Sequence, residues 1–359
     1  MENLIKVLIV EDSAASQLLL VHILDADPRL TVMGTANDGE HALRFLQRNQ
    51  PDVIVMDIHM PAMSGYETTR RIMETRPVPI VICTASFASA DVSNTFRALE
   101  AGALALVSKP VGPGHHQFEE MAAKLVETVF LMSEVKLVRR RPLVPRTIRP
   151  CTAADPIQLP AAKGHSVVAI GVSTGGPPVL QTILAGLPKN FPQPLLIVQH
   201  IASGFLTGLV EWLEQTTGFP TTIAQQGESL EPGHAYLAPD FHHLGVTPQG
   251  RVALSMAAPD NGLRPSVAHL FHSVAKASGA HAVAILLTGM GRDGAKELKE
   301  LRDAGAVTIA QDAKSSIVHG MPGEAIKLDA ATYVRSPEQI PALLIELAVA
   351  RSRRAGVPT

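Results

Sequence analysis

The first third of the chain alternates short apolar runs with amphipathic stretches. Five apolar runs have the length of buried strands, and they occupy 7–10, 32–36, 53–56, 80–83 and 103–107. Each is followed by a stretch with apolar residues at helical spacing, at 14–24, 40–48, 66–75, 93–100 and 118–138. Strands that are apolar throughout are buried on both faces of a sheet. Their alternation with helices predicts a doubly wound (βα)5 domain over residues 1–125, whose last helix continues to about residue 138.

This alternation stops at residue 139. Residues 139–163 contain five prolines and several arginines without a sustained hydrophobic period. Prolines at this density favour an extended, semi-rigid chain. We therefore interpret 139–163 as a linker between two domains.

A second α/β pattern follows over 164–350. Its apolar strand-like runs are 167–172, 195–200, 282–289 and 307–311, and its helix-like stretches are 179–185, 205–216, 267–277, 295–304 and 337–350. A β-rich insert with proline–glycine turn signals lies between 221 and 254. The pattern predicts a three-layer α/β domain, followed by a tail at 351–359.

Composition narrows the class of protein. The formal net charge is −2 over 359 residues, so no global charge favours nucleic acid or an anionic membrane as a partner. The chain has only two cysteines, which excludes a disulfide framework and fits a reducing compartment. No apolar run approaches the ~18 residues of a membrane span. We expect a soluble, cytoplasmic protein without membrane insertion.

Five polar residues follow the strand-like runs of the first domain. They are Glu11, Asp12, Asp57, Thr84 and Lys109. The carboxyl ends of parallel strands meet at one sheet edge, where open α/β sheets bind ligands. Carboxylates at such an edge suit Mg²⁺, and a carboxylate can also accept a phosphoryl group. The pattern predicts a phosphorylation site, because coincidence of all five at strand ends is improbable.

With these residues, the first 125 positions resemble a response-regulator receiver domain. The resemblance implies that Asp57 is the phosphoacceptor and that Glu11, Asp12 and Asp57 hold Mg²⁺. It also implies that Thr84 and Lys109 couple phosphorylation to conformation. Receivers usually carry Tyr or Phe three residues before the lysine, whereas this chain has Leu106.

Candidate chemistry in the second domain follows three different strands. Gly171-x-Ser173-x-Gly175 has the spacing of a nucleophile elbow, in which a tight turn projects the serine. His200 follows the next strand-like run, and Asp293 follows a later one. Serine, histidine and aspartate at one sheet edge predict a Ser-His-Asp triad. The alternative for the first motif alone is a glycine turn with Ser173 as a helix cap.

A dinucleotide site is a rival interpretation of one glycine motif. Gly289-x-Gly291-x-x-Gly294 follows a strand, precedes a helix and has Asp312 downstream, which matches that fingerprint. However, Asp293 lies inside the loop that a pyrophosphate would approach and would repel it. The rival also leaves Ser173 without a role.

The second domain resembles the catalytic domain of chemotaxis protein-glutamate methylesterases of the CheB type. The matching stretches are IGVSTGG, VQHIASGF, GHAYLAPDFHH, RPSVAHLFHSVA, AILLTGMGRDGA and IAQDAKSSIVHGMPGEAI. The resemblance implies that Ser173 is the nucleophile, His200 the general base and Asp293 its orienting group. It places the backbone N–H groups of Thr174 and Met290 near the oxyanion.

The resemblance also implies a substrate and a mode of regulation. The substrate would be glutamate methyl esters on the cytoplasmic helices of methyl-accepting chemoreceptors, with deamidation of glutamines as a related activity. A histidine kinase would supply the phosphoryl group, and the unphosphorylated receiver would block the catalytic face. Mg²⁺ is expected in the receiver, and no cofactor is expected at the esterase site.

Two other function classes remain open from sequence. A transcription-type response regulator would need a basic DNA-reading helix in its second half, and we find none. A two-component output protein with a degenerate esterase domain would act as a binding scaffold. The presence of Ser173, His200 and Asp293 argues against the scaffold, but sequence alone does not prove turnover.

Overall fold

The computed structural model describes residues 4–85, 89–135 and 167–354. The chain divides into two compact units, Met1–Pro150 and Cys151–Thr359. The division falls within the predicted linker, 139–163, which lies outside the described residues together with 355–359. No helix in the described ranges combines the length and apolarity that a membrane crossing requires.

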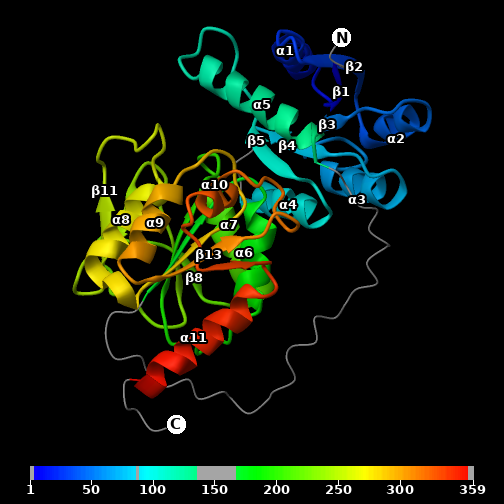
Figure 1. Ribbon diagram of the computed structural model, residues 1–359. Helices are drawn as coiled ribbons and strands as arrows, with labels where there is room; N and C mark the ends of the chain where they lie inside the picture. The colour runs from blue at the N-terminus through cyan, green and yellow to red at the C-terminus, as the bar shows by residue number, and fades with distance from the viewer. Residues whose placement is uncertain (1–3, 86–88, 136–166, 355–359) are drawn as a thin grey trace. The chain divides into compact units, whose positions relative to one another are not determined.

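The first unit alternates five strands with five helices, as the apolar pattern predicts. In chain order the elements are β1 (Ile5–Val10), α1 (Ala14–Asp25), β2 (Leu30–Ala36), α2 (Gly39–Arg48), β3 (Val53–Met56), α3 (Gly65–Thr75), β4 (Ile80–Thr84), α4 (Ser89–Glu100), β5 (Ala105–Ser108) and α5 (Phe118–Ser133). The strands form one parallel sheet in the order β2-β1-β3-β4-β5. Helices α1 and α5 pack on one face, and α2, α3 and α4 pack together on the other (Figure 1).

The second unit is built on a seven-stranded parallel sheet in the order β14-β13-β12-β6-β7-β9-β8. Its first elements are β6 (Val168–Val172), α6 (Gly176–Ala185), β7 (Leu195–Gln199), α7 (Leu206–Thr217), β8 (Thr221–Ile223) and β9 (Ala235–Leu237). There follow β10 (His243–Val246), β11 (Val252–Ser255), α8 (Val267–Ser278), a short 3-10 helix (Gly279–His281) and β12 (Val283–Leu286). The last are α9 (Ala295–Asp303), β13 (Val307–Gln311), α10 (Met321–Lys327), β14 (Tyr333–Arg335) and α11 (Ile340–Arg354).

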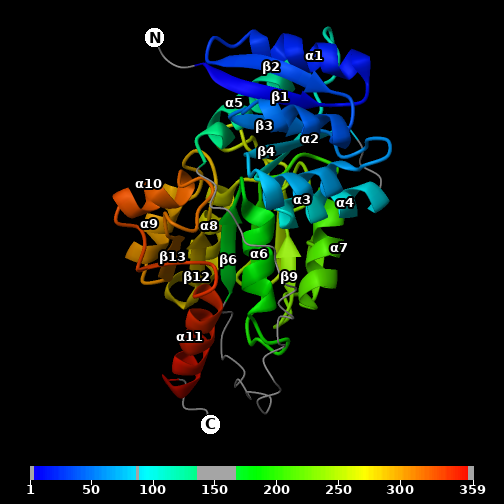
Figure 2. The ribbon, with the colours of Figure 1, turned by 90° about the vertical axis from the view of Figure 1, so that its right-hand side faces the viewer.

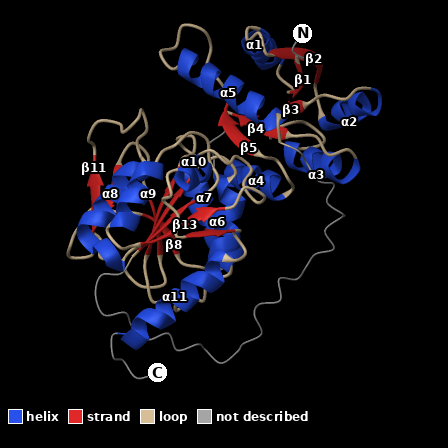
Figure 3. Cartoon of the chain, viewed as in Figure 1, coloured by secondary structure: helices blue, strands red, loops and turns tan. Residues whose placement is uncertain are grey.

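Helices cover both faces of this sheet. Helices α6, α7 and α11 pack on one face and α8, α9 and α10 on the other, so the unit has three layers (Figures 2 and 3). The core on the α8 and α9 side contains fully buried residues from strands and helices alike, including Val198, Phe271 and Leu298. The predicted three-layer α/β fold is confirmed.

The strands of the predicted β-rich insert do not form a separate unit of their own. Its strands β8 and β9 join the main sheet in parallel, and only β10 and β11 form a separate antiparallel pair. Helix α10 and strand β14 are not predicted from the sequence, and α11 extends to Arg354, into the residues assigned to the tail.

Candidate active site and phosphorylation site

The sheet order of the second unit brings the predicted triad to one edge. Strand β6 lies between β12 and β7, so chain connections leave it in opposite directions on its two sides. Such a switch point is where open α/β sheets form a ligand crevice. Ser173 follows β6, His200 follows β7, and Asp293 lies between β12 and α9. All three polar residues therefore leave adjacent strands at the same edge.

Backbone contacts fix the loop that carries Ser173. Its N–H donates to the carbonyl of Thr288, and its carbonyl accepts the N–H of Gly176 in a tight turn. Gly175 has φ of +78° at the start of α6, which a residue without Cβ adopts at little cost. A Cβ on Gly289 would come within 2.6 Å of the Ser173 Cβ, so the β12 loop lies directly against the serine.

His200 and Asp293 form the closest pair of the predicted triad. The Nε2 atom of His200 lies 3.0 Å from Oδ2 of Asp293, and both side chains are largely buried. The contact is close but lacks hydrogen-bond alignment, so Nε2 has no hydrogen-bond partner. Because Nε2 faces the carboxylate, Nδ1 is the ring nitrogen left to act on another group. The backbone N–H of His200 pairs with the carbonyl of Val172, the residue before Ser173.

Asp293 also caps a helix, a role that the sequence did not predict. Its two carboxylate oxygens accept the N–H groups of Val267, at 2.7 Å, and Ala268, at 3.1 Å, in the first turn of α8. A helix N-terminus stabilises a negative charge. The buried carboxylate is therefore oriented by α8 on one side while it faces His200 on the other.

A buried polar network that sequence analysis missed joins the loops that carry the predicted triad. The Nε2 group of Gln199 donates at 2.9 Å to the carbonyl of Ser173 and at 2.9 Å to that of His200. The Oγ1 of Thr288 donates to the carbonyl of Thr174 at 2.9 Å. A Cβ on Gly176 would come within 2.0 Å of Oε1 of Gln199, so only glycine fits beside this amide.

Gln199→Leu should therefore disturb the loops of Ser173 and His200 at once. Two buried carbonyls lose their donor, which typically costs about 1–3 kcal/mol of the free energy of unfolding. We also expect kcat to fall at least about 10-fold, since displaced catalytic groups lose rate steeply. Urea unfolding and ester-hydrolysis rates measure the two effects. Gln193→Leu, at an equally buried glutamine before β7, is the control: it should cost stability without a specific loss of kcat.

The predicted oxyanion donors lie on the loops that meet at Ser173. Thr174 follows the serine directly, and Met290 follows Gly289 on the neighbouring loop. Within the described ranges, no protein oxygen accepts the backbone N–H of Thr174 or Met290. Both N–H groups are thus available to a substrate oxygen.

The dinucleotide interpretation does not fit this edge. A Cβ on Gly320 would lie 2.7 Å from the Gly289 carbonyl oxygen and 3.0 Å from the Gly291 nitrogen. The N–H groups of Gly320 and Met321 both donate to that carbonyl. The glycine loop is thus covered by the chain itself, at Gly320 and Met321.

In the first unit the predicted residues meet at the edge beside β1 and β3. Glu11 and Asp12 follow β1, Asp57 follows β3, and one oxygen from each lies within 4.8 Å of the others. The Nζ of Lys109 lies 2.7 Å from Oε2 of Glu11 and 3.0 Å from Oδ2 of Asp57. Thr84 is buried at the end of β4, and its carbonyl accepts the N–H of Lys109.

The electrostatics of this edge suit a divalent cation. Burial raises the pKa of Glu11, and the charge of Asp57 adds to this against the opposing effect of Lys109. Burial would lower the pKa of Lys109, but its contacts with the two carboxylates outweigh burial and raise it. Oε2 of Glu11 has the ion pair but no aligned hydrogen bond. Three carboxylates with one lysine leave excess negative charge and oxygen ligands, which fits Mg²⁺.

Comparison with known proteins decides the family. The profile of the CheB methylesterase family matches residues 168–344, and that of the response regulator receiver domain matches 7–117. A protein-glutamate methylesterase/protein-glutamine glutaminase of Geobacter metallireducens is 53% identical over 96% of this chain and 99% of its own length. The chain belongs to the CheB methylesterase family.

Other relatives agree with this assignment. A protein of the same name from Syntrophus aciditrophicus is 50% identical over 96% of this chain and 99% of its own length. The crystal structure of the Thermotoga maritima CheB methylesterase catalytic domain is 39% identical, with a TM-score of 0.50. The match covers 52% of this CheB-family chain and 99% of the Thermotoga chain, and it confirms the fold of the second unit. The receiver and methylesterase domains predicted from sequence are confirmed.

Proposed function

We propose that this protein is a phosphorylation-activated serine esterase that hydrolyses glutamate methyl esters on chemoreceptors in bacterial two-component signalling. The observation that carries the proposal is the convergence of Ser173, His200 and Asp293 at one sheet edge, in a chain that matches family relatives over nearly its whole length. A receiver domain in the same chain supports control by phosphorylation. A histidine kinase is the proposed phosphodonor and the cytoplasm the proposed compartment.

In the proposed reaction, the Ser173 hydroxyl attacks the ester carbonyl while His200 takes its proton through Nδ1. The N–H groups of Thr174 and Met290 stabilise the oxyanion. The tetrahedral intermediate collapses as the imidazolium returns the proton to the leaving methoxide, and methanol departs. Water, deprotonated by His200, then hydrolyses the glutamyl-serine ester to a carboxylate and free serine. Asp293 stabilises the imidazolium and fixes its orientation.

The same residues would support glutamine deamidation. An amide carbonyl accepts the same attack, and ammonia leaves instead of methanol. The relatives carry the names of both activities, methylesterase and glutaminase. The esterase site needs no cofactor for either reaction, because its nucleophile, base and oxyanion donors are protein groups.

In the receiver we propose that Asp57 is the phosphoacceptor. Glu11, Asp12 and Asp57 would hold Mg²⁺, which neutralises phosphoryl oxygens when bound. Lys109 is already in contact with Asp57 and would follow the phosphoryl charge, with Thr84 at the adjacent strand end. Leu106 is half-buried where receivers usually carry an aromatic residue, so we propose that the switch depends more on contacts between the domains.

A methanol-release assay on methylated chemoreceptor, with and without a small-molecule phosphodonor and Mg²⁺, tests the function. We expect methanol release that the phosphodonor increases. A serine-directed phosphonate probe should label Ser173. A scaffold with a degenerate esterase domain would neither release methanol nor react with the probe, so either negative result favours the scaffold.

A further inference from the structure

A second group of metal-ligating side chains lies in the esterase domain, apart from the triad. It consists of His243 on β10, Asp260 in the loop after β11, and His269 in the first turn of α8. One ligand atom from each side chain lies within 4.8 Å of the others. The proposed function gives this group no role, and none of its members touches Ser173 or His200 in the described contacts.

His243 presents a nitrogen that lacks a partner. The side chain is fully buried, and its Nε2 lies 3.1 Å from the carbonyl of Ala258. A carbonyl only accepts, so Nε2 carries the proton and Nδ1 carries a lone pair. This Nδ1 is buried without a hydrogen-bond partner. Buried polar atoms are rarely left unpaired, and each one requires an explanation.

His269 and Asp260 lie next to this nitrogen. The His243 and His269 rings stack with centroids 4.4 Å apart and an interplanar angle of 16°. Nδ1 of His269 lies 3.8 Å from Oδ2 of Asp260, a separation too long for a hydrogen bond.

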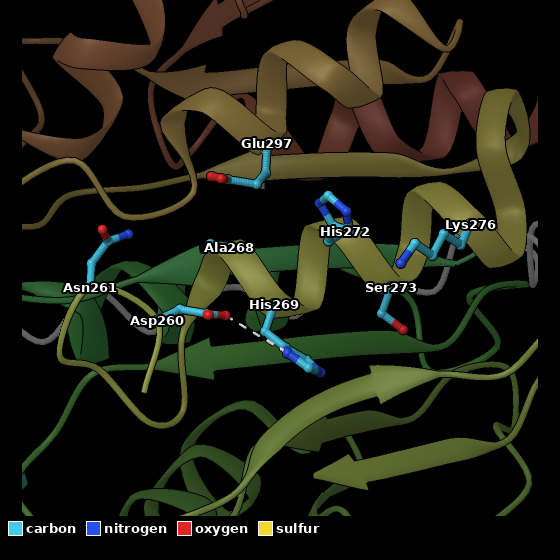
Figure 4. Close-up of a pocket in the computed structure, with 8 residues that line it drawn as sticks. All are labelled: Asp260, Asn261, Ala268, His269, His272, Ser273, Lys276 and Glu297. Atoms are coloured by element: carbon cyan, nitrogen blue, oxygen red, sulfur yellow. Dashed lines mark ion pairs between the residues drawn. The ribbon is translucent and has the colours of Figure 1, made fainter. Parts of the chain in front are cut away.

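The group opens onto solvent through a cavity of about 570 Å³. Asp260 and His269 form part of its wall, and Figure 4 shows their side chains directed toward each other. His272, Lys276 and Glu297 line other parts of the same cavity. An ion therefore has an entry path to the cluster.

We propose that His243, Asp260 and His269 form a binding site for Zn²⁺ or a similar late first-row divalent ion. Two imidazoles and one carboxylate are a typical zinc ligand set, with water as the fourth ligand. Such a site needs ligand atoms about 3.4 Å apart, given metal–ligand distances near 2.0–2.2 Å. The half-exposed Asp260 and the His269 ring turn to reach that spacing, while buried His243 stays fixed. Mg²⁺ and Ca²⁺ prefer oxygen ligands and suit the receiver site instead.

The position of the site connects it to the active-site scaffold. Oδ2 of Asp260 lies 3.2 Å from Oγ of Ser266, which caps α8 by accepting the N–H of His269. The two N–H groups before it in the same turn, those of Val267 and Ala268, donate to the carboxylate of Asp293. A bound ion would thus fasten the Asp260 loop to the same helical turn that holds the proposed catalytic aspartate.

Co²⁺ titration of the chelator-treated full-length chain tests the site. Excess Mg²⁺ is present throughout to occupy the receiver carboxylates. We expect one Co²⁺ per chain with the visible absorption of tetrahedral coordination, displaced by Zn²⁺. His269→Gln and Asp260→Asn should each weaken binding at least about 10-fold. His272→Gln, on the same helix and cavity, and His200→Gln, at the triad, should leave binding unchanged.

A gain-of-signal variant guards against loss through misfolding. Asp260→Cys should keep the site and add a thiolate-to-cobalt charge-transfer band that the unaltered chain lacks, although that chain contains Cys83 and Cys151. Thermal unfolding with and without Zn²⁺ should show stabilisation that His269→Gln removes. Absence of Co²⁺ binding overturns the proposal. So does binding that survives both ligand variants, or binding that disappears in His200→Gln or His272→Gln.

Discussion

Ser173→Ala should lower methanol release by at least about 10⁴-fold, because the hydroxyl proposed to form the acyl bond is gone. His200→Ala should be about as damaging, since residues that act as one unit are strongly non-additive. The measurement is kcat for methanol release from methylated receptor. Ser203→Ala, at an exposed serine beyond His200, is the control and should retain full activity.

Asp293→Asn separates the two contacts of the aspartate. We expect a loss of orders of magnitude in kcat, smaller than for Ser173→Ala, because the imidazolium loses its stabilising charge. The asparagine Nδ2 would also face an N–H of Val267 or Ala268, which leaves a buried donor unpaired. The variant should therefore lose about 1–3 kcal/mol of stability as well, while Ser173→Ala should not.

Two outcomes for these variants would contradict the proposed mechanism. Near-normal methanol release by Ser173→Ala, with its fold intact by circular dichroism, would rule out a serine nucleophile. An Asp293→Asn protein that loses activity only in proportion to its unfolding would show a structural role for the aspartate and no catalytic one.

The apolar pattern predicted the long elements well because their burial is visible in single runs. Strands β3 and β6 are buried along their whole length, so they read as continuous apolar segments. Strands β8, β9 and β14 have three residues each, which is too short for a period to appear. Their place in the main sheet depends on pairing between segments that are distant in sequence.

The site was predictable where chemistry follows a strand and less so where it depends on tertiary contacts. Each member of the predicted triad, Ser173, His200 and Asp293, follows the carboxyl end of a strand. The sheet order places these strand ends next to one another. The bond from Asp293 to α8 joins loops from different parts of the chain and leaves no local signal. Gln199 does have a local signal, because it is a polar residue at the end of an otherwise apolar strand.

Asp57→Ala should retain basal methanol release and lose its stimulation by a phosphodonor with Mg²⁺. Phosphorylation adds nearly two negative charges. At Asp57 that charge would lie beside Lys109, whose Nζ contacts the carboxylates of both Glu11 and Asp57 in the unphosphorylated structure. The lysine should move toward the phosphoryl group and change the surface at the ends of β4 and β5. Asp52→Ala, at an exposed aspartate before β3, is the matched control and should respond like the unaltered protein.

Removing residues 1–150 tests how the receiver exerts its control. If the unphosphorylated receiver blocks the catalytic face, the isolated second unit should release methanol faster than the unphosphorylated full-length chain. It should also be insensitive to the phosphodonor, because Asp57 is absent. A second unit that is folded but no faster than the full-length chain would exclude steric inhibition. If Asp57→Ala also shows no stimulation by the phosphodonor, the receiver would then act by bringing the esterase to its receptor. In that case the stimulation of the full-length chain should shrink as the receptor concentration rises above KM.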